Sequence, residues 1–177
     1  MTFSLQPMDP QTFRQQTRRS TLIVTVMFVV LAMGCAYLAV VLFGDASSED
    51  NFKWNLTGVI CGVILTSIIV RCVFWHQAWM QPAVYNWKLK RHLMQVTNVM
   101  HKVTDGIEKN QPEALKLMNF YQQGLLQMYE LDGNTHEVDT VTRERRVLVE
   151  KMKANGLDSD NKSFNPEWVK VLNGPQL

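Results

Sequence analysis

Two long uncharged stretches dominate the first half of this chain. Residues 20–44 contain no charged side chain, and residues 54–70 are uncharged as well. A helix rises about 1.5 Å per residue, so roughly 20 apolar residues cross a hydrocarbon layer of about 30 Å. The Leu, Ile, Val and Phe residues of the first stretch favour insertion by about −5 kcal/mol. The sequence therefore predicts two membrane-spanning helices, at 21–43 and 54–75, joined by a short loop at 44–53.

Basic residues at the ends of these stretches predict their orientation. Arg14, Arg18 and Arg19 precede the first, and Lys88, Lys90 and Arg91 follow the second. The loop carries Asp45, Glu49 and Asp50 against Lys53. Positively charged flanks stay on the cytoplasmic side, so we expect both termini there. Residues 1–20 then form a cytoplasmic segment and residues 76–177 a cytoplasmic domain.

Several basic side chains are predicted to contact lipid headgroups. Arg71 lies about one helical turn from the inner end of the second span, where a long side chain can reach the headgroup region. Basic residues beside the membrane surface are attracted to anionic lipid. The predicted headgroup contacts are Arg18, Arg19, Arg71, Lys88, Lys90 and Arg91.

Small residues in both stretches predict where the two helices touch. Close backbone approach is what holds helices together in lipid, because lipid tails already satisfy large apolar side chains. Gly58 and Gly62 form a G-x-x-x-G pattern in the second stretch, and Ala32, Ala36 and Ala39 give the first a matching surface. Packing within one chain is favoured over a dimer interface.

The second half of the chain has helical periodicity. Beyond Pro82, apolar residues alternate four and three apart from Leu89 to Ile107, which predicts one helix with a single apolar seam. A second helix is expected to run to about Asp132, and a third to end near Asn155. The predicted seam of the second helix is Ala114, Met118, Tyr121, Leu125 and Met128. Short loops between helices of similar length predict an antiparallel three-helix bundle, so the expected fold class is all-α.

Capping residues mark the expected helix ends. Asp9 before Pro10 and Asn165 before Pro166 are typical of an N-cap followed by the first helical residue, and the latter starts a short C-terminal helix. Asn110 with Glu113, and Asn134 with Glu137, are spaced as capping boxes. Gly133 is expected to end the second helix.

The motifs of common chemistries are missing from this sequence. A net charge of +2 is too small for a nucleic-acid binder that neutralises many phosphates. His76, His92, His101 and His136 are scattered, with no neighbouring ligand at metal-binding spacing. There is no phosphate-cradling glycine loop and no recognisable nucleophile. We therefore expect no enzyme activity, no cofactor, no metal and no nucleic-acid partner.

Residues 119–132 combine aromatic, amide and glycine residues in one predicted helix. A glycine inside a helix costs about 1 kcal/mol, which favours close packing around Gly124. Core packing by Phe120, Tyr121 and Leu125 is the favoured interpretation. The alternative is a partner-docking face made of Gln122, Gln123, Gln127 and Tyr129.

This stretch, together with residues 51–59 and the Tyr85-x-Trp87-x-Leu89-Lys90 pattern, carries a resemblance. The chain resembles a family of two-pass inner-membrane proteins of Gram-negative bacteria, known as a domain of unknown function. The resemblance covers most of the chain. It implies an inner-membrane location and transfers no active-site residues.

The leading hypothesis is a non-enzymatic accessory or scaffold subunit that presents its cytoplasmic bundle to a protein partner. The alternative is a homo-oligomeric two-span channel, with Thr25, Asn55, Thr57, Thr66 and Ser67 as the polar lining candidates. A loop of this length is too short for a re-entrant filter, which disfavours the channel.

Overall fold

A computed structural model describes residues 2–44 and 51–174, which fall into two compact units. One unit is residues 15–84. The other combines residues 1–14 with residues 85–177. The division differs from the predicted segments, because the first 14 residues join the C-terminal helices instead of forming a separate N-terminal piece. Most of the predicted loop at 44–53 lies outside the described residues.

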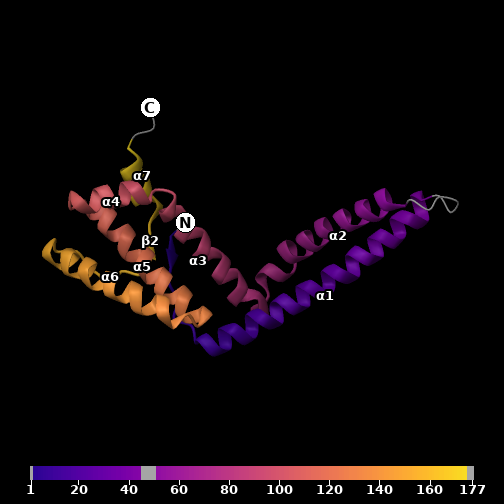
Figure 1. Cartoon of the computed structure of the whole chain (residues 1–177), viewed down its shortest axis with the longest axis horizontal. Coiled ribbons are helices and arrows are strands. Elements are labelled where there is room, and N and C mark those ends of the chain that lie inside the picture. Colours follow the sequence, from indigo (N-terminus) through magenta and orange to yellow (C-terminus); the bar gives the residue numbers. More distant parts are fainter. Residues whose placement is uncertain (1, 45–50, 175–177) are drawn as a thin grey trace. The chain divides into compact units, whose positions relative to one another are not determined.

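The described residues are mostly helical (Figure 1). The α-helices are α1 (Pro10–Phe43), α2 (Phe52–Cys72), α3 (Gln81–Thr97), α4 (Met100–Glu108), α5 (Pro112–Asp132), α6 (Thr135–Ala154) and α7 (Pro166–Asn173). Two 3-10 turns, η1 (Phe74–His76) and η2 (Ala78–Met80), lie between α2 and α3. Two short strands, β1 (Phe3–Ser4) and β2 (Ser163–Phe164), complete the elements. The all-α prediction is confirmed at this level.

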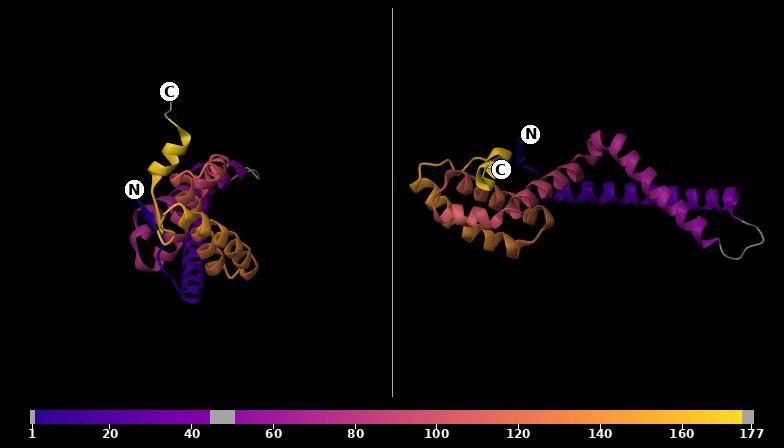
Figure 2. Two further views of the ribbon diagram at one scale, coloured as in Figure 1. Left: turned by 90° about the vertical axis from the view of Figure 1, so that its left-hand side faces the viewer. Right: turned by 90° about the horizontal axis from the view of Figure 1, so that it is seen from above.

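The unit of residues 15–84 is built from α1 and α2, which run alongside each other in opposite chain directions (Figure 2). By length and composition, Pro10–Phe43 and Phe52–His76 are long and apolar enough to cross a membrane. In the most apolar part of the first helix only 6% of the residues are buried, and in that of the second helix 17% are buried. Large apolar side chains such as Leu22, Met33 and Ile64 are therefore exposed along both helices.

The predicted small residues lie where the two helices meet. An added Cβ at Gly58 would collide with the Ala36 Cα and lie 2.6 Å from the Cys35 carbonyl oxygen. An added Cβ at Gly62 would lie 2.6 Å from the Ala32 Cα. Ala32 is buried, and Ala36 and Ala39 are half-buried. The two backbones thus come close together at Gly58 and again one turn later at Gly62. At neither position is there room for a Cβ atom.

Contacts near both ends of this unit also join α1 to α2 and to η2, which follows α2. The Phe43 and Trp54 rings stack with centroids 5.2 Å apart. At the other end, the buried Ser20 hydroxyl lies 2.8 Å from the carbonyl oxygens of both Gln16 and Trp79. The first helix therefore contacts the segment that follows it near both ends, at Phe43–Trp54 and at Ser20–Trp79.

The other unit is organised around α5. This helix contacts α4, α6, α7 and β2, and Gly124 brings it against Leu93 and Leu89 of α3. An added Cβ at Gly124 would lie 2.7 Å from Leu93 Cδ2, which accounts for the mid-helix glycine. The core residues that are fully buried include Leu89, Val96, Val103, Ala114, Leu117, Phe120 and Phe164.

Two features of this unit differ from the sequence-based prediction. The helix expected from Leu89 to Ile107 is divided, because α3 ends at Thr97 and α4 begins at Met100. The predicted α5 seam is only part of the buried surface of this helix: Met118, Tyr121, Leu125 and Met128 pack against the core but are half-buried. The completely buried α5 side chains lie elsewhere on the helix, at Leu115, Leu117 and Phe120. A helix with neighbours on several sides has no single apolar face.

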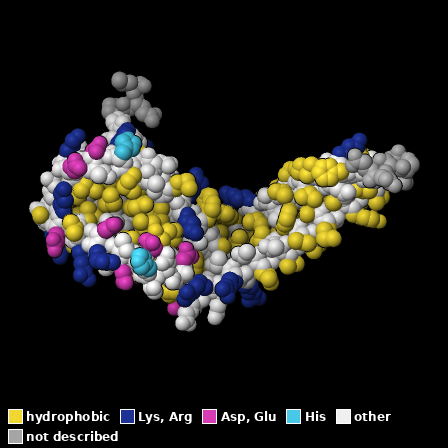
Figure 3. Space-filling view, viewed as in Figure 1, with side chains coloured by type: hydrophobic (Ala, Val, Ile, Leu, Met, Phe, Trp, Pro, Cys, Tyr) yellow, Lys and Arg dark blue, Asp and Glu magenta, His cyan; other side chains and the backbone are white. Residues whose placement is uncertain are grey.

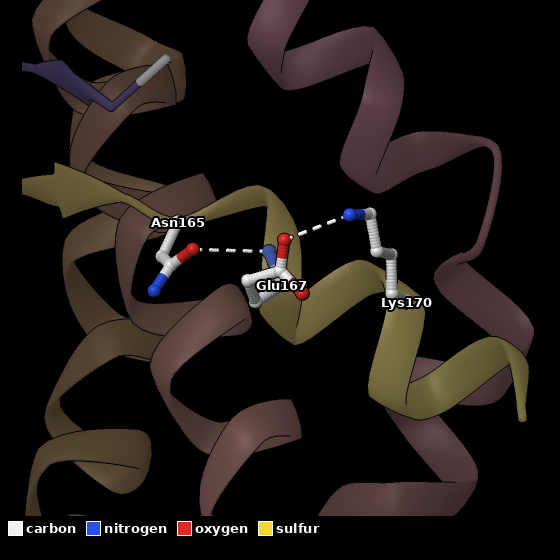
Figure 4. A network of polar contacts seen from close by, with 3 residues as sticks. All are labelled: Asn165, Glu167 and Lys170. Carbon is white, nitrogen blue, oxygen red and sulfur yellow. Dashed lines mark hydrogen bonds and ion pairs between the residues drawn. The ribbon is translucent and has the colours of Figure 1, made fainter.

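Most predicted caps are present. Asp9 Oδ2 accepts a hydrogen bond from the Thr12 N–H at 2.8 Å, which lowers the pKa of the Asp9 carboxyl, and Gly133 ends α5 with φ +77°. Asn134 Oδ1 accepts from the Glu137 N–H at 3.5 Å. Asn165 caps α7 by accepting from the Glu167 N–H at 3.0 Å, and Glu167 pairs with Lys170 at 2.8 Å (Figure 4). The predicted box at Asn110 is wrong: Gln111 is the N-cap of α5, and Asn110 adopts φ 54°.

Strands β1 and β2 pair antiparallel, with Phe3 opposite Phe164 and Ser4 opposite Ser163. The Leu5 N–H extends the ladder by donating to the Lys162 carbonyl at 3.0 Å, and the two serine hydroxyls lie 3.0 Å apart. This pair joins the two ends of the sequence and was absent from the predicted fold.

The close approach at Gly58 generates a first prediction. Gly58→Val is expected to destabilise the α1–α2 pair by about 1–3 kcal/mol, because the added side chain must displace the Ala36 backbone. The measurement is loss of helical circular dichroism during titration of the detergent-solubilised full chain with SDS. Gly34→Val is the matched control, since an added Cβ at Gly34 meets no atom within 4 Å. Equal midpoints for the two variants would contradict the contact.

Candidate functional site

Polar side chains of α5 tie the N-terminal segment to the helical domain. The Tyr85 hydroxyl donates to Gln127 Oε1 at 2.6 Å and accepts from the Gln6 N–H at 3.0 Å. Gln127 Nε2 donates in turn to the Gln6 carbonyl oxygen. The amide oxygen of Gln127 is therefore bound to Tyr85 of α3, and its amide nitrogen holds residue 6 against α5.

A second group of polar side chains holds the segment that follows α6. Asn119 Nδ2 donates to the Ser159 carbonyl at 3.1 Å, and Gln123 Nε2 donates to the Asn161 carbonyl at 3.1 Å. Arg145 of α6 also reaches the Ser159 carbonyl, through Nη2 at 3.2 Å. This fixes the approach to β2, which pairs with the N-terminal strand.

These contacts correct the predicted partner-docking face. Gln122 and Gln123 are 8% and 9% exposed, and Gln127 is hydrogen-bonded on both sides of its amide. Tyr129 is half-buried, and burial, followed by the nearby Glu137 carboxylate, raises the pKa of its hydroxyl. Gln123 and Gln127 serve other segments of the chain, and the buried Gln122 Oε1 has no hydrogen-bond partner among the described residues. Sequence reasoning missed this because a buried amide and an exposed one look alike in a sequence.

A cleft of about 490 Å³ lies beside these polar contacts. It is lined by apolar residues of the N-terminal segment, such as Leu5 and Met8, and by charges of both signs. The charged lining residues are Glu130, Arg145, Asp160 and Lys162. The Arg145 Nε is buried with no hydrogen-bond partner. With two cations and two anions, this cleft has no net preference for one sign of ligand charge.

A second cleft, of about 430 Å³, lies between α3 and the strand pair. From here on it is called the α3 cleft, and its lining residues include Trp87, Lys88, Arg91 and His92 of α3. Among its described lining residues there is no Asp or Glu. Phe3 of β1 and Phe164 of β2 form the opposite wall. The α3 cleft is therefore cationic and partly aromatic.

Ring contacts shape the wall and the rim of the α3 cleft. The His92 ring stacks on Phe3 with centroids 4.5 Å apart and meets the edge of Phe164 at 5.0 Å. The Arg91 guanidinium lies over the Trp87 ring at 5.1 Å from its centroid, a cation–π contact. The strand pair thus supplies one wall of the cleft and holds the His92 ring of the other.

The predicted headgroup residues fall into two groups. Arg18, Arg19 and Arg71 belong to the unit of residues 15–84, where all three are exposed and Arg71 lies over the Trp75 ring at 4.9 Å. Lys88, Lys90 and Arg91 are exposed residues of α3 in the other unit. Lys88 and Arg91 line the α3 cleft, and Lys90 does not. His92, which looked scattered in the sequence, joins them there.

Within residues 2–44 and 51–174, no group of three or more His, Cys, Asp or Glu side chains could hold a metal ion. Hydrophobic side chains cover much of α1 and α2, and others gather on one face of the helical domain over α5 and its neighbours (Figure 3). The part of α5 that is not fully covered carries Met118, Tyr121, Leu125 and Met128.

These features define an all-α protein with two long apolar helices near its N-terminus and a compact helical domain. A comparison with family models confirms the resemblance to a family of unknown function. The chain belongs to the family described as protein of unknown function (DUF3087), whose model matches residues 3–169. The comparison with curated proteins and that with solved structures found no match.

The Tyr85 contacts generate a second prediction. Tyr85→Phe is expected to lower the free energy of unfolding by about 1–3 kcal/mol at neutral pH, because Gln127 and Gln6 each lose a partner. The measurement is thermal unfolding of the full chain in neutral detergent, followed by circular dichroism.

The same variant tests a pH effect. Burial raises the pKa of Tyr85 above 10.0. A group whose folded pKa is raised gives stability that is fully present below the unfolded value and is lost as pH rises through the folded pKa. The native chain is therefore expected to lose stability above about pH 10, and Tyr85→Phe to lose less over the same range. Parallel stability–pH curves for the two proteins would contradict this role of Tyr85.

Proposed function

We propose that this protein is a two-span inner-membrane protein with both ends in the cytoplasm. The low burial of α1 and α2 supports the membrane location, because their exposed apolar surface is compatible with lipid and unfavourable in water. The bacterial inner membrane is the location implied by the family resemblance. Arginines 14, 18 and 19 before the first span and the basic residues of α3 after the second support the orientation.

The pairing of the chain's two ends is a second, independent support for this topology. Residues 1–14 and 85–177 form one compact unit, joined by β1–β2 and by Gln6 to Gln127. A compact unit lies on one side of a bilayer, because irregular backbone and polar side chains are not tolerated in lipid. The segment before α1 and the segment after α2 must then be on the same side. This requires an even number of crossings, as two spans provide.

Within that topology, the protein acts as a non-enzymatic accessory or scaffold subunit. The observation that carries this is a half-buried stripe of α5, formed by Met118, Tyr121, Leu125 and Met128, whose side chains pack against the core and keep part of their surface exposed. These residues are three and four positions apart, so they share one side of the helix. Methionine-rich apolar surfaces adapt to varied partners. The stripe is proposed to dock a protein partner, replacing the predicted Gln face.

A homo-oligomeric channel has less support. The Thr57 and Ser67 hydroxyls donate to carbonyl oxygens of their own helix, at Lys53 and Val63, both at 2.8 Å. Thr66 is 7% exposed within the α1–α2 unit. These candidate pore-lining residues therefore offer few groups to a permeating ion.

The membrane location yields a third prediction. The full chain is expected to stay in the membrane pellet after carbonate extraction, as lipid-embedded helices do. A fluorescent protein fused to the C-terminus is expected to fluoresce, and alkaline phosphatase fused there to be inactive, because the C-terminus is cytoplasmic. Release into the carbonate supernatant would rule out the two-span location, and active phosphatase would reverse the orientation.

The accessory role yields a fourth prediction. A photo-crosslinking amino acid at Met128 is expected to join the chain to one discrete foreign protein in native membranes, while the same group at the exposed Glu144 of α6 does not. Native mass spectrometry of the gently extracted complex then gives its composition and copy number. A closed ring of identical chains would support the channel instead. Identical crosslinking patterns at the two positions would contradict docking on the α5 stripe.

A further inference from the structure

We propose that the α3 cleft binds the phosphate of an anionic phospholipid headgroup. This inference rests on the proposed membrane location and adds a defined ligand site to it. Lys88 and Arg91 supply positive charge from one side, and Phe3, Trp87 and Phe164 supply apolar surface. The sequence predicted only diffuse contacts between basic residues and lipid, and it contained no sign of a cleft.

Charge is the first argument for this ligand. The α3 cleft is lined by two side chains that carry a positive charge, and by none that carries a negative charge, among its described residues. A concave surface lined by one sign of charge raises the local concentration of the opposite ion. The Arg91 guanidinium can present parallel N–H groups to two phosphate oxygens, and the Lys88 ammonium adds a point charge. The cleft beside α5 has charges of both signs and lacks this selectivity.

The geometry of α3 gives the second argument. Successive helical residues are about 100° apart, so Lys88, Arg91 and His92 fall on one side of the helix and Lys90 falls about 200° from Lys88. The residues that line the cleft agree with this helical geometry: Lys88, Arg91 and His92 line it, whereas Lys90 is exposed elsewhere on the helix. Two of the three residues Lys88, Lys90 and Arg91 thus line one concavity.

The walls of the cleft provide the third argument. His92 is held between Phe3 and Phe164, and Arg91 is held over Trp87. These contacts limit side-chain motion, so less conformational entropy is lost when a ligand binds. A volume of about 430 Å³ is sufficient for a phosphoglycerol headgroup, and the aromatic side chains suit the glycerol and ester region beside it.

Chain connectivity favours a lipid over a soluble phosphate. The α3 helix begins at Gln81, shortly after the second apolar segment ends at His76. Under the proposed topology, Lys88 and Arg91 are cytoplasmic and lie 12 and 15 residues beyond His76 in the sequence, and anionic headgroups are concentrated at the membrane surface on that side. A short connection to a span favours a ligand that is itself part of the membrane.

The test uses the full chain in neutral detergent, titrated with phosphatidylglycerol or phosphatidylcholine of matched acyl chains and followed by native mass spectrometry. Phosphatidylglycerol is expected to bind more tightly. Lys88→Gln and Arg91→Gln are each expected to weaken its binding about 5-fold, because each removes a favourable phosphate contact. Arg91→Lys is expected to lose less than Arg91→Gln, since the charge remains.

Lys90→Gln is the matched control, because it removes the same charge from the same helix outside the cleft, and it is expected to change the affinity by less than about 2-fold. Equal losses for Lys90→Gln and Arg91→Gln would overturn the cleft in favour of diffuse attraction. Equal affinities for the two lipids, or displacement of phosphatidylglycerol by equimolar inorganic phosphate, would also overturn it. Carbonate extraction of the same variants separates the two proposals: a retained chain without lipid selectivity fails only the cleft.

Discussion

Tyr85, Gln127 and Gln6 form a hydrogen-bonded chain that joins segments separated by the whole α1–α2 hairpin. Each bond contributes on the order of 1 kcal/mol, and the β1–β2 ladder adds to it. These contacts hold the N-terminal segment in place. That segment supplies the Phe3 wall of the α3 cleft and covers α5 beside Gln127. The helical domain is therefore discontinuous in sequence, and the hairpin is an insertion into it.

The sequence predicted helix ends well where the signal is local. Asp9, Asn134 and Asn165 cap the helices as expected, because a short polar side chain beside an uncovered N–H needs no information from elsewhere in the chain. The box at Asn110 was wrong although its spacing was right, because the chain turns at Asn110 with φ 54° and α5 starts one residue later. The division between Thr97 and Met100 was missed because the apolar spacing of four and three continues across it.

The candidate site was predicted only in part, and the reason is tertiary. Lys88 and Arg91 were singled out from charge alone, but their cleft needs Phe3 and Phe164, which two-residue strands bring together without any periodicity. Gln123 and Gln127 were predicted to face a partner because amides are polar. Gln123 instead donates to a loop carbonyl at Asn161, and Gln127 accepts from the Tyr85 hydroxyl of α3. An amide's role depends on what covers it, and the covering segments lie 38 and 42 residues away in sequence.

The α1–α2 pair distributes its side chains in the opposite way to a soluble helical pair. Small residues such as Gly58, Gly62 and Ala32 occupy the contact, while large apolar residues such as Met33 and Leu42, each 69% exposed, point away from it. In water, each exposed large side chain would forgo about 1.5–3 kcal/mol of burial, so this arrangement would be poor for a soluble protein. In lipid there is no such loss, and the remaining attraction between helices is the dispersion gained where backbones come close. The glycines are thus placed at the positions where a bilayer-embedded pair can still gain free energy by associating.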